Sequence, residues 1–335
     1  MTDAVFDHPR VAAVYDALDP DRSDLDAYAA MVTEFGGSRV LDIGCGTGTF
    51  ATMLAARGVE VTGVDPAGAS LDVARGKPHA ESVTWIPGTA VDALPLQVDL
   101  VFMTANVAQV FVGDRAWADV LAVAHASLVP GGRLVFETRD PDRRAWERWT
   151  PELTRHVVDV SDEGPVEEWV EVVDVRDGCV TFESPTIFHR DGVRIDSTTT
   201  LRFRTRAELT ASLRAAGFDV DEVRDAPDRP GAEFVFIARK VPAATDAAAL
   251  TRLLRRRDAA GLFADLDPWG LVAIGAPRDE YTPEVDALLA LTRPVTPDEV
   301  QATFTRMAQP VSDVDAFGLA DAFNAVLARH PEPAT

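Results

Sequence analysis

The sequence predicts an α/β fold, doubly wound around a sheet of parallel strands, followed by a small all-α domain. Three observations predict it. Short apolar runs alternate with helical stretches from about residue 39, a strand pattern with hairpin turns replaces them after residue 137, and only helical patterns follow residue 245. The 335 residues are enough for two domains that each bury a core.

The parallel part of the sheet is predicted from a βαβαβ rhythm. The expected strands are RVLDI (39–43), VEVTGVD (59–65), SVTWIPG (82–88), VDLVFM (98–103) and RLVFET (133–138). A helix is expected from about Asp114 to Leu128, and a Pro-Gly-Gly turn at 130–132 precedes the fifth strand. Because helices connect the strands, the strands are expected to run parallel.

An antiparallel insertion is expected at about 150–205. Its alternating pattern is interrupted by Asp177-Gly178 and Asp191-Gly192, which are hairpin-turn dipeptides. A helix with Gly217 at its end follows, and then two closing strands, FDVDEVRD (218–225) and EFVFIARK (233–240). The first domain is therefore expected to span residues 1–240.

Residues 241–335 are expected to form the helical domain. Thr282-Pro283 and Thr296-Pro297 each predict an N-cap followed by proline at the first helical position. The segment LFADLDPWGLV, followed by Asp279-Glu280-Tyr281, resembles small helical proteins of unknown function. That resemblance implies no activity. The domain is expected to contact the first domain, a second copy or another partner rather than perform chemistry.

The charge balance disfavours several partners. Thirty-two Lys and Arg against 54 Asp and Glu leave a net charge of −22, which repels nucleic acid and anionic membranes. Cys45 and Cys179 are the only cysteines, and without CxxC spacing they predict neither a disulfide framework nor a metal site. No run of about 18 apolar residues and no secretory leader is found, so a cytoplasmic location is expected.

The most informative segment is a strand that leads into the loop Gly44-Cys45-Gly46-Thr47-Gly48 and then into a helix. Glycines let the backbone approach a ligand closely. A dinucleotide fingerprint needs its third glycine at position 49, where this chain has Thr49. Asp42, just before the loop, would repel a pyrophosphate but suits a ligand with an ammonium or sulfonium group, which favours S-adenosylmethionine.

An acidic residue follows at the end of the next strand. Asp65 stands where a carboxylate can accept hydrogen bonds from both hydroxyls of a ribose. NAD and S-adenosylmethionine both carry that ribose, so Asp65 does not separate them. With the glycine loop, however, it makes a nucleoside cofactor the expectation.

Residues 40–75, VLDIGCGTGTFATMLAARGVEVTGVDPAGASLDVAR, resemble the first motif and acidic second strand of class I S-adenosylmethionine-dependent methyltransferases. The resemblance extends to about Lys240 and implies their seven-stranded, Rossmann-like sheet with a reversed final strand. It also implies cofactor contacts from Asp42, Gly44, Cys45, Gly46, Gly48, Asp65, Pro66, Thr89 and Ala90. Asn106 is expected to contact the cofactor or orient a substrate because it follows the fourth strand, on the crevice side of the sheet. The family often reads Gly-Asp-Ala after the third strand, whereas here Thr89 lacks the carboxylate and Asp92 or backbone groups would replace it.

Methyl transfer depends on alignment of the acceptor with the sulfonium, so a catalytic base is optional. Candidate catalytic residues are Tyr15, in a helix that covers the cofactor in related enzymes, Asn106 after the fourth strand, and His189 in the insertion. Packing and surface positions are the alternative roles of Tyr15 and His189. Apolar residues of the insertion such as Trp169 are expected to roof a pocket, which favours a small-molecule acceptor.

Four functions remain open from the sequence. The leading hypothesis is a methyltransferase that acts on a small molecule. The alternatives are a non-catalytic S-adenosylmethionine-binding regulatory module, a protein methyltransferase, and an NAD(P)-dependent oxidoreductase, which Asp42 and the glycine spacing disfavour.

Overall fold

A computed structural model describes residues 3–241, 247–273, 281–307 and 311–332. The chain divides into two compact units, Met1–Thr245 and Asp246–Thr335. Each unit has its own hydrophobic core and is described by itself.

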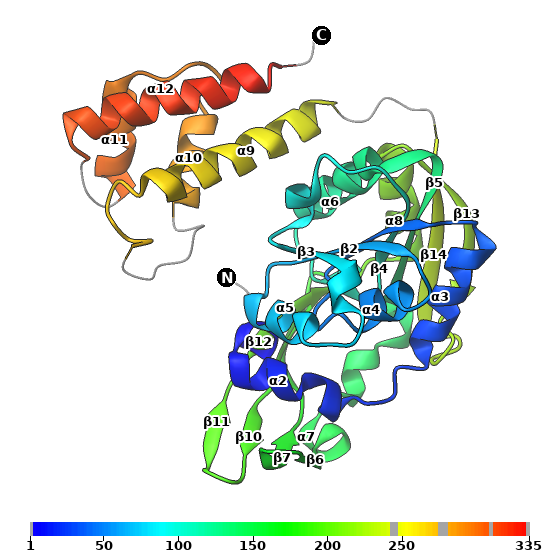
Figure 1. Cartoon of the computed structure of the whole chain (residues 1–335). Coiled ribbons are helices and arrows are strands. Elements are labelled where there is room, and N and C mark those ends of the chain that lie inside the picture. Colours follow the sequence, from blue (N-terminus) through cyan, green and yellow to red (C-terminus); the bar gives the residue numbers. More distant parts are fainter. Residues whose placement is uncertain (1–2, 242–246, 274–280, 308–310, 333–335) are drawn as a thin grey trace. The chain divides into compact units, whose positions relative to one another are not determined.

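The first unit is built on a seven-stranded sheet with the order β13-β14-β5-β4-β1-β2-β3 (Figure 1). The strands are β1 (Arg39–Ile43), β2 (Glu60–Asp65), β3 (Val83–Pro87), β4 (Val98–Met103), β5 (Leu128–Arg139), β13 (Phe218–Asp225) and β14 (Glu233–Lys240). Strands β1 to β5 pair in parallel, and β14 runs antiparallel to both β5 and β13. The predicted sheet with its reversed final strand is confirmed.

Helices flank this sheet, so its central strands β1 and β4 are mostly apolar and buried. The connecting helices are α4 (Thr49–Ala55), α5 (Gly68–Arg75), α6 (Asp114–Ser127) and α8 (Arg206–Ala215), and α3 (Asp24–Glu34) precedes β1. Short 3₁₀ turns lie at Ala80–Ser82, Ala90–Ala93, Val107–Gln109, Pro141–Arg143 and Ala145–Arg148. One core cluster joins Leu25 and Tyr28 of α3 and Phe50 of α4 to Val40 and Phe102 of the sheet. The sheet is thereby fixed beneath the loops that leave its carboxyl edge.

The insertion between β5 and α8 forms two small antiparallel sheets. One has the order β11-β10-β7-β6 and comprises β6 (His156–Val160), β7 (Gly164–Glu168), β10 (Thr186–Phe188) and β11 (Val193–Ile195). The other has the order β12-β9-β8 and comprises β8 (Glu171–Arg176), β9 (Cys179–Glu183) and β12 (Thr198–Arg202), while the helix α7 (Pro151–Thr154) precedes β6. Both hairpin dipeptides lie between paired strands as predicted, and Asp177 and Gly178 both have positive φ, at 52° and 72°.

Two N-terminal helices, α1 (Ala4–Asp7) and α2 (Pro9–Leu18), pack against the insertion (Figure 1). Val11 and Val14 of α2 share a core cluster with Val166 and Phe188 of the four-stranded sheet. Arg10 adds ion pairs to Glu163 at 2.6 Å and Asp191 at 2.7 Å. Part of the insertion's apolar face is therefore covered by α2.

The second unit contains α9 (Ala247–Leu266), α10 (Thr282–Leu289), α11 (Pro297–Met307) and α12 (Asp313–Arg329). Their core includes Phe263, Tyr281, Phe304 and Phe323. Thr296 caps α11 as predicted, since its hydroxyl accepts a hydrogen bond from the N–H of Glu299. Helix α10 begins at Thr282 itself, one residue earlier than predicted, which is within the ordinary spread of helix ends.

The pattern that includes Asp267 and Tyr281 forms a hydrogen-bonded turn. The buried Tyr281 hydroxyl donates to Asp267 at 2.6 Å, and Asp267 also accepts from the N–H groups of Val272 and Ala273. These contacts give the pattern a structural role. Among the helices of the described ranges, none is both long and apolar enough to cross a membrane.

Candidate functional site

The glycine loop connects β1 to α4, and its three glycines have positive φ angles, in the left-handed region of the backbone. Gly44, Gly46 and Gly48 have φ values of 73°, 52° and 77°. A Cβ atom on Gly44 would lie 2.7 Å from Val107, and one on Gly48 would lie 2.5 Å from the Trp85 ring. A Cβ on Gly46 would meet nothing within 4 Å. Gly44 and Gly48 are therefore required by packing, whereas Gly46 leaves open space where a ligand can approach the backbone.

Asp65 fastens the same loop from the end of β2. Its two carboxylate oxygens accept hydrogen bonds from the N–H groups of Gly46 and Ala67, both at 2.8 Å. Burial raises the pKa of Asp65, and these two N–H groups oppose the rise. Each oxygen keeps a second acceptor position, so the carboxylate can still accept two hydroxyl groups.

Asp42, one residue before the end of β1, is almost completely buried, with 1% of its surface exposed. Neither carboxylate oxygen has a hydrogen-bond partner. Burial, and then the charge of Asp65, raise the pKa of Asp42 to about 7, while the charge of Arg22 opposes them. Because an unpartnered buried carboxylate is costly, a positively charged ligand group is the partner that this position favours.

Helix α2 is bound to the glycine loop through Asp16. The Thr47 hydroxyl donates to Asp16 at 2.6 Å, and the Lys77 ammonium pairs with Asp16 at 2.5 Å. Lys77 also donates to the Thr49 hydroxyl at 2.7 Å. Sequence reasoning missed Asp16 and Lys77, because the helical pattern of α2 does not reveal what the helix covers.

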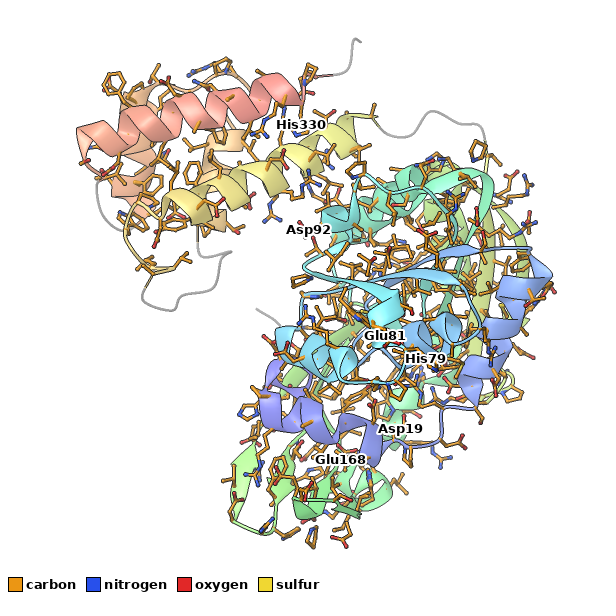
Figure 2. All side chains as sticks on the ribbon, in the orientation of Figure 1. Asp19, His79, Glu81, Asp92, Glu168 and His330 are labelled. Atoms are coloured by element: carbon orange, nitrogen blue, oxygen red, sulfur yellow. The ribbon has the colours of Figure 1, made fainter. Side chains whose placement is uncertain are left out.

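Tyr15, the neighbour of Asp16, lies at the boundary between α2 and the insertion. Burial raises its pKa, and the charge of Arg22 opposes the rise. Asp19, at the end of α2, and Glu168 of β7 lie at the same boundary (Figure 2), and the charges of both raise the pKa of Tyr15 further. Tyr15 and Asp42 thus both lie within the influence of the Arg22 charge.

Asn106 follows β4 in a left-handed conformation, with φ at 60°, and is 96% buried, with 4% of its surface exposed. Its backbone N–H donates to Glu137 and its amide donates to Glu233, both at 3.2 Å, while its Oδ1 atom has no partner. The Tyr28 hydroxyl also donates to Glu137. A buried polar network therefore joins the ends of β4, β5 and β14.

Two arginines extend this network, and neither was identified from the sequence. Arg229 donates to Glu233 at 2.8 Å, and Arg139 lies 3.6 Å from the same carboxylate. Arg139 also donates to the side-chain oxygen of Gln109 at 2.9 Å. The available signal was the spacing of Glu137 and Arg139, two charges two residues apart at the end of an apolar strand.

The predicted adenine loop adjoins Asp65. The N–H of Gly88 donates to the Asp65 carbonyl at 3.0 Å, and the Thr89 N–H and hydroxyl donate to Asp92 at 2.8 and 3.1 Å. Asp92, labelled in Figure 2, thus holds the turn that begins Ala90–Ala93. The exposed Thr89 and the buried Ala90 stand beside the end of β2.

The remaining predicted residues have different surroundings. Cys45 is buried, and Pro66, directly after Asp65, is exposed. His189 is exposed after β10 and lies 2.8 Å from the Glu167 carboxylate. Among the described residues, His189 forms hydrogen bonds only within the insertion, to Glu167 and Pro165. These hydrogen bonds do not connect it to the glycine loop or to Asn106.

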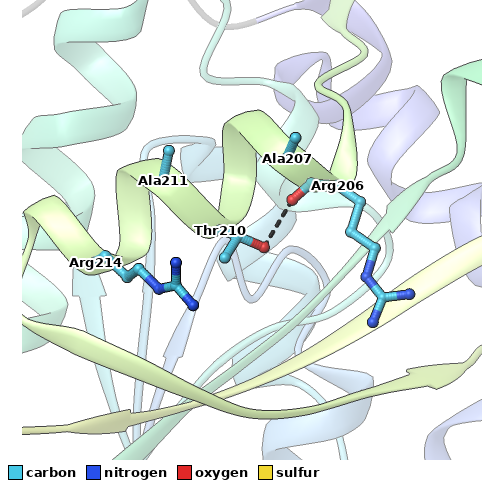
Figure 3. A pocket seen from close by; sticks show the side chains of 5 residues that line it. All are labelled: Arg206, Ala207, Thr210, Ala211 and Arg214. Carbon is cyan, nitrogen blue, oxygen red and sulfur yellow. Dashed lines mark hydrogen bonds between the residues drawn. The ribbon is translucent and has the colours of Figure 1, made fainter.

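A hollow of about 480 Å³ lies along α8 and is lined by Arg206, Ala207, Thr210, Ala211 and Arg214 (Figure 3). The Thr210 hydroxyl donates to the Arg206 carbonyl at 2.8 Å. None of the candidate site residues lines this hollow. In the described ranges, His, Cys, Asp and Glu form no group of three or more that could hold a metal ion.

Comparison with known proteins gives the family of the first unit. Residues 40–132 match the family model for a methyltransferase domain, a range that includes the glycine loop, Asp65 and Asn106. The chain carries a methyltransferase domain. Outside this range, the seven-stranded sheet continues through β14, so the domain is larger than the matched segment.

Two relatives and one solved structure resemble this methyltransferase domain. The chain is 28% identical over 218 residues to the biotin biosynthesis bifunctional protein BioHC of Cellvibrio japonicus, covering 62% of this chain and 39% of that protein. It is 38% identical over 117 residues to a ubiquinone biosynthesis O-methyltransferase of Idiomarina loihiensis, covering 33% and 46%. The S-adenosylmethionine-bound amino pentose methyltransferase CalS10 of Micromonospora echinaspora superposes with a TM-score of 0.53 at 23% identity, covering 68% and 97%.

The sequence relatives and the solved structure support different conclusions. The chain spans less than half the length of either relative. The likeness to the solved structure concerns the fold, which is the class I S-adenosylmethionine-dependent methyltransferase fold. The methyltransferase domain and its fold are thus established, and the activity of the whole chain is treated below.

Proposed function

We propose that this protein is an S-adenosylmethionine-dependent methyltransferase that acts on a small-molecule acceptor. The observation that carries the proposal is the unpartnered, buried carboxylate of Asp42 beside the open backbone of Gly46 and the carboxylate of Asp65. An ammonium group, a close backbone approach and a ribose are features of one ligand, S-adenosylmethionine.

The residues present fit this cofactor. Asp42 would hold the ammonium group of its methionine part, Gly46 would leave room for that part, and Asp65 would accept the ribose hydroxyls. Thr89 and Ala90 stand beside Asp65, where the adenine would follow the ribose. An NAD pyrophosphate would instead face the buried Asp42 carboxylate.

When bound, S-adenosylmethionine supplies an electrophilic methyl group on its sulfonium. The protein's own contribution is alignment and the exclusion of water. Asp16 and Lys77 hold α2 on the glycine loop, and Val11 and Val14 hold the same helix on the insertion. Asn106 is a further candidate to orient the cofactor or acceptor, because its buried Oδ1 atom can accept a hydrogen bond.

A small-molecule acceptor is favoured because α2, which is bound to the glycine loop, also packs on the insertion. The two relatives and the solved structure described above are named for biotin synthesis, for ubiquinone synthesis and for an amino pentose, which supports an acceptor of this size. We assign cofactor binding to residues 1–240 and contacts with this domain, a second copy or a partner to residues 241–335.

Calorimetric titration of the purified chain with S-adenosylmethionine, S-adenosylhomocysteine and NADH tests the cofactor. Micromolar binding of the first two and none of NADH is expected, whereas binding of NADH alone would overturn the proposal. Release of S-adenosylhomocysteine with small acceptors, compared with a basic peptide, then separates a small-molecule enzyme from a protein methyltransferase. A chain that binds the cofactor but turns over with neither class would be a binding module.

A further inference from the structure

We propose that Arg139 binds an anionic group, a carboxylate or a phosphate, on the methyl acceptor. The inference rests on the proposed function and narrows its substrate class from small molecules to small organic anions. Three observations support it: the position of Arg139 at the end of β5, the pairing of the neighbouring Glu233 with Arg229, and the unpartnered Nε2 atom of Gln109.

Arg139 is the last residue of β5, at the carboxyl edge of the sheet, where open α/β folds bind their ligands. It pairs in register with Glu233 of the neighbouring β14, and the 3₁₀ turn Val107–Gln109 that follows β4 lies beside it. This is the edge that carries Asp42 and Asn106. Arg139 is therefore on the side of the sheet from which an acceptor would meet the cofactor.

Glu233 does not need Arg139 as its main counter-charge. Arg229 donates to Glu233 at 2.8 Å, and the Asn106 amide donates to its other oxygen at 3.2 Å. The Nε atom of Arg139 lies 3.6 Å from Glu233, which is beyond hydrogen-bond length. Much of the hydrogen-bonding capacity of the Arg139 guanidinium is thus left for another acceptor.

The guanidinium of Arg139 is fixed by its neighbours but is not fully buried. It donates to the Oε1 atom of Gln109 at 2.9 Å, and its central carbon lies 5.3 Å from the centre of the Trp149 ring. The Arg139 side chain nevertheless keeps 21% of its surface exposed, so a ligand can reach it. Burial lowers the pKa of Arg139 and the charge of Glu233 opposes this, so a further negative group nearby would stabilise the cation.

Gln109 supplies a second donor at the same place. Its side chain is completely buried, and its Nε2 atom has no hydrogen-bond partner. This nitrogen belongs to the amide whose oxygen accepts from Arg139, so the two donor groups are neighbours. A carboxylate or phosphate offers several acceptor oxygens and can satisfy both, whereas a protonated amine would be repelled by Arg139.

The test is calorimetric titration of the full-length chain, saturated with S-adenosylhomocysteine, with benzoate and phenyl phosphate, and with neutral benzamide as the comparison. At least one anion is expected to bind about tenfold or more tightly than benzamide. The variant Arg139→Met is expected to lose about tenfold or more of that affinity. Arg133→Met, which removes an arginine from the middle of β5 and away from its carboxyl end, is the matched control and is expected to bind as the parent protein does.

Binding of S-adenosylhomocysteine is measured in every variant, because it distinguishes failure of the proposed function from failure of the Arg139 proposal. If the parent protein does not bind it, the proposed function fails; if it does but prefers benzamide or binds neither anion, the Arg139 proposal is overturned. Equal anion affinity in Arg139→Met also overturns it. Should Arg139→Met fail to fold, Arg139→Gln, which also removes the charge, and Gln109→Ala provide the same comparison, and the parent's preference for an anion over benzamide needs no variant.

Discussion

The Thr47 hydroxyl donates a hydrogen bond to the carboxylate of Asp16 at 2.6 Å, joining the glycine loop to helix α2. Lys77 completes the contact through an ion pair with Asp16 at 2.5 Å. The opposite side of α2 packs on Val166 and Phe188 of the insertion. Helix α2 thus links the glycine loop to the insertion, and we expect a ligand that leaves the loop to require movement of α2.

Asp16→Ala is expected to speed the dissociation of S-adenosylhomocysteine about fivefold, because α2 loses a hydrogen bond and a partly exposed ion pair worth about 1 kcal/mol together. Stopped-flow fluorescence measures the rate. Asp26→Ala, which removes the surface pair of α3 with Arg57, is the control and should leave the rate unchanged. An unchanged rate in Asp16→Ala would show that α2 does not limit release.

Asp65→Ala is expected to weaken binding of S-adenosylmethionine by about 1.5 to 3 kcal/mol, because a charge-assisted contact to the ribose is lost. The same change frees the N–H groups of Gly46 and Ala67, so a lower melting temperature is expected as well. Calorimetry and thermal unfolding measure the two effects. Undiminished affinity in a folded Asp65→Ala would remove the ribose assignment.

The sequence predicted those residues of the candidate site whose position follows from strand order. Asp42 and Asp65 end near each other because β1 and β2 are parallel neighbours, which the βαβ rhythm implies. Asp16 and Lys77 were missed because their meeting depends on where α2 packs. Arg139 was missed because the sequence pattern of a charged residue at a strand end is the same whether its side chain faces solvent or a binding site.

In the second unit, Tyr281→Phe is expected to lower the free energy of unfolding by about 1 to 2 kcal/mol. The substitution removes the donor to Asp267 and leaves the N–H of Trp269 without its acceptor. Urea unfolding followed by tryptophan fluorescence measures the change. Affinity for S-adenosylhomocysteine is expected to stay constant, and a parallel loss of that affinity would contradict the assignment of cofactor binding to residues 1–240.

Asp42 predicts how cofactor binding depends on pH. Its pKa is raised from an ordinary 3.8 to about 7 in the ligand-free protein, so the carboxylate is largely protonated below pH 7. For a carboxyl group with a raised folded-state pKa, the folded protein binds more protons than the unfolded chain. The contribution of Asp42 to stability therefore falls as pH rises from about 4 to 7.

An ammonium group beside Asp42 requires the charged form, so binding of S-adenosylhomocysteine should release a proton below pH 7 and tighten as pH rises. From the pKa of about 7, the affinity at pH 8 should be about tenfold higher than at pH 6. Titrations in buffers of different ionisation enthalpy measure both the affinity and the proton release. Asp65 also has a raised pKa, so Asp42→Asn is needed to separate the two groups. That variant should bind more weakly and lose most of the pH dependence, and a full tenfold change in Asp42→Asn would assign the titration to another group.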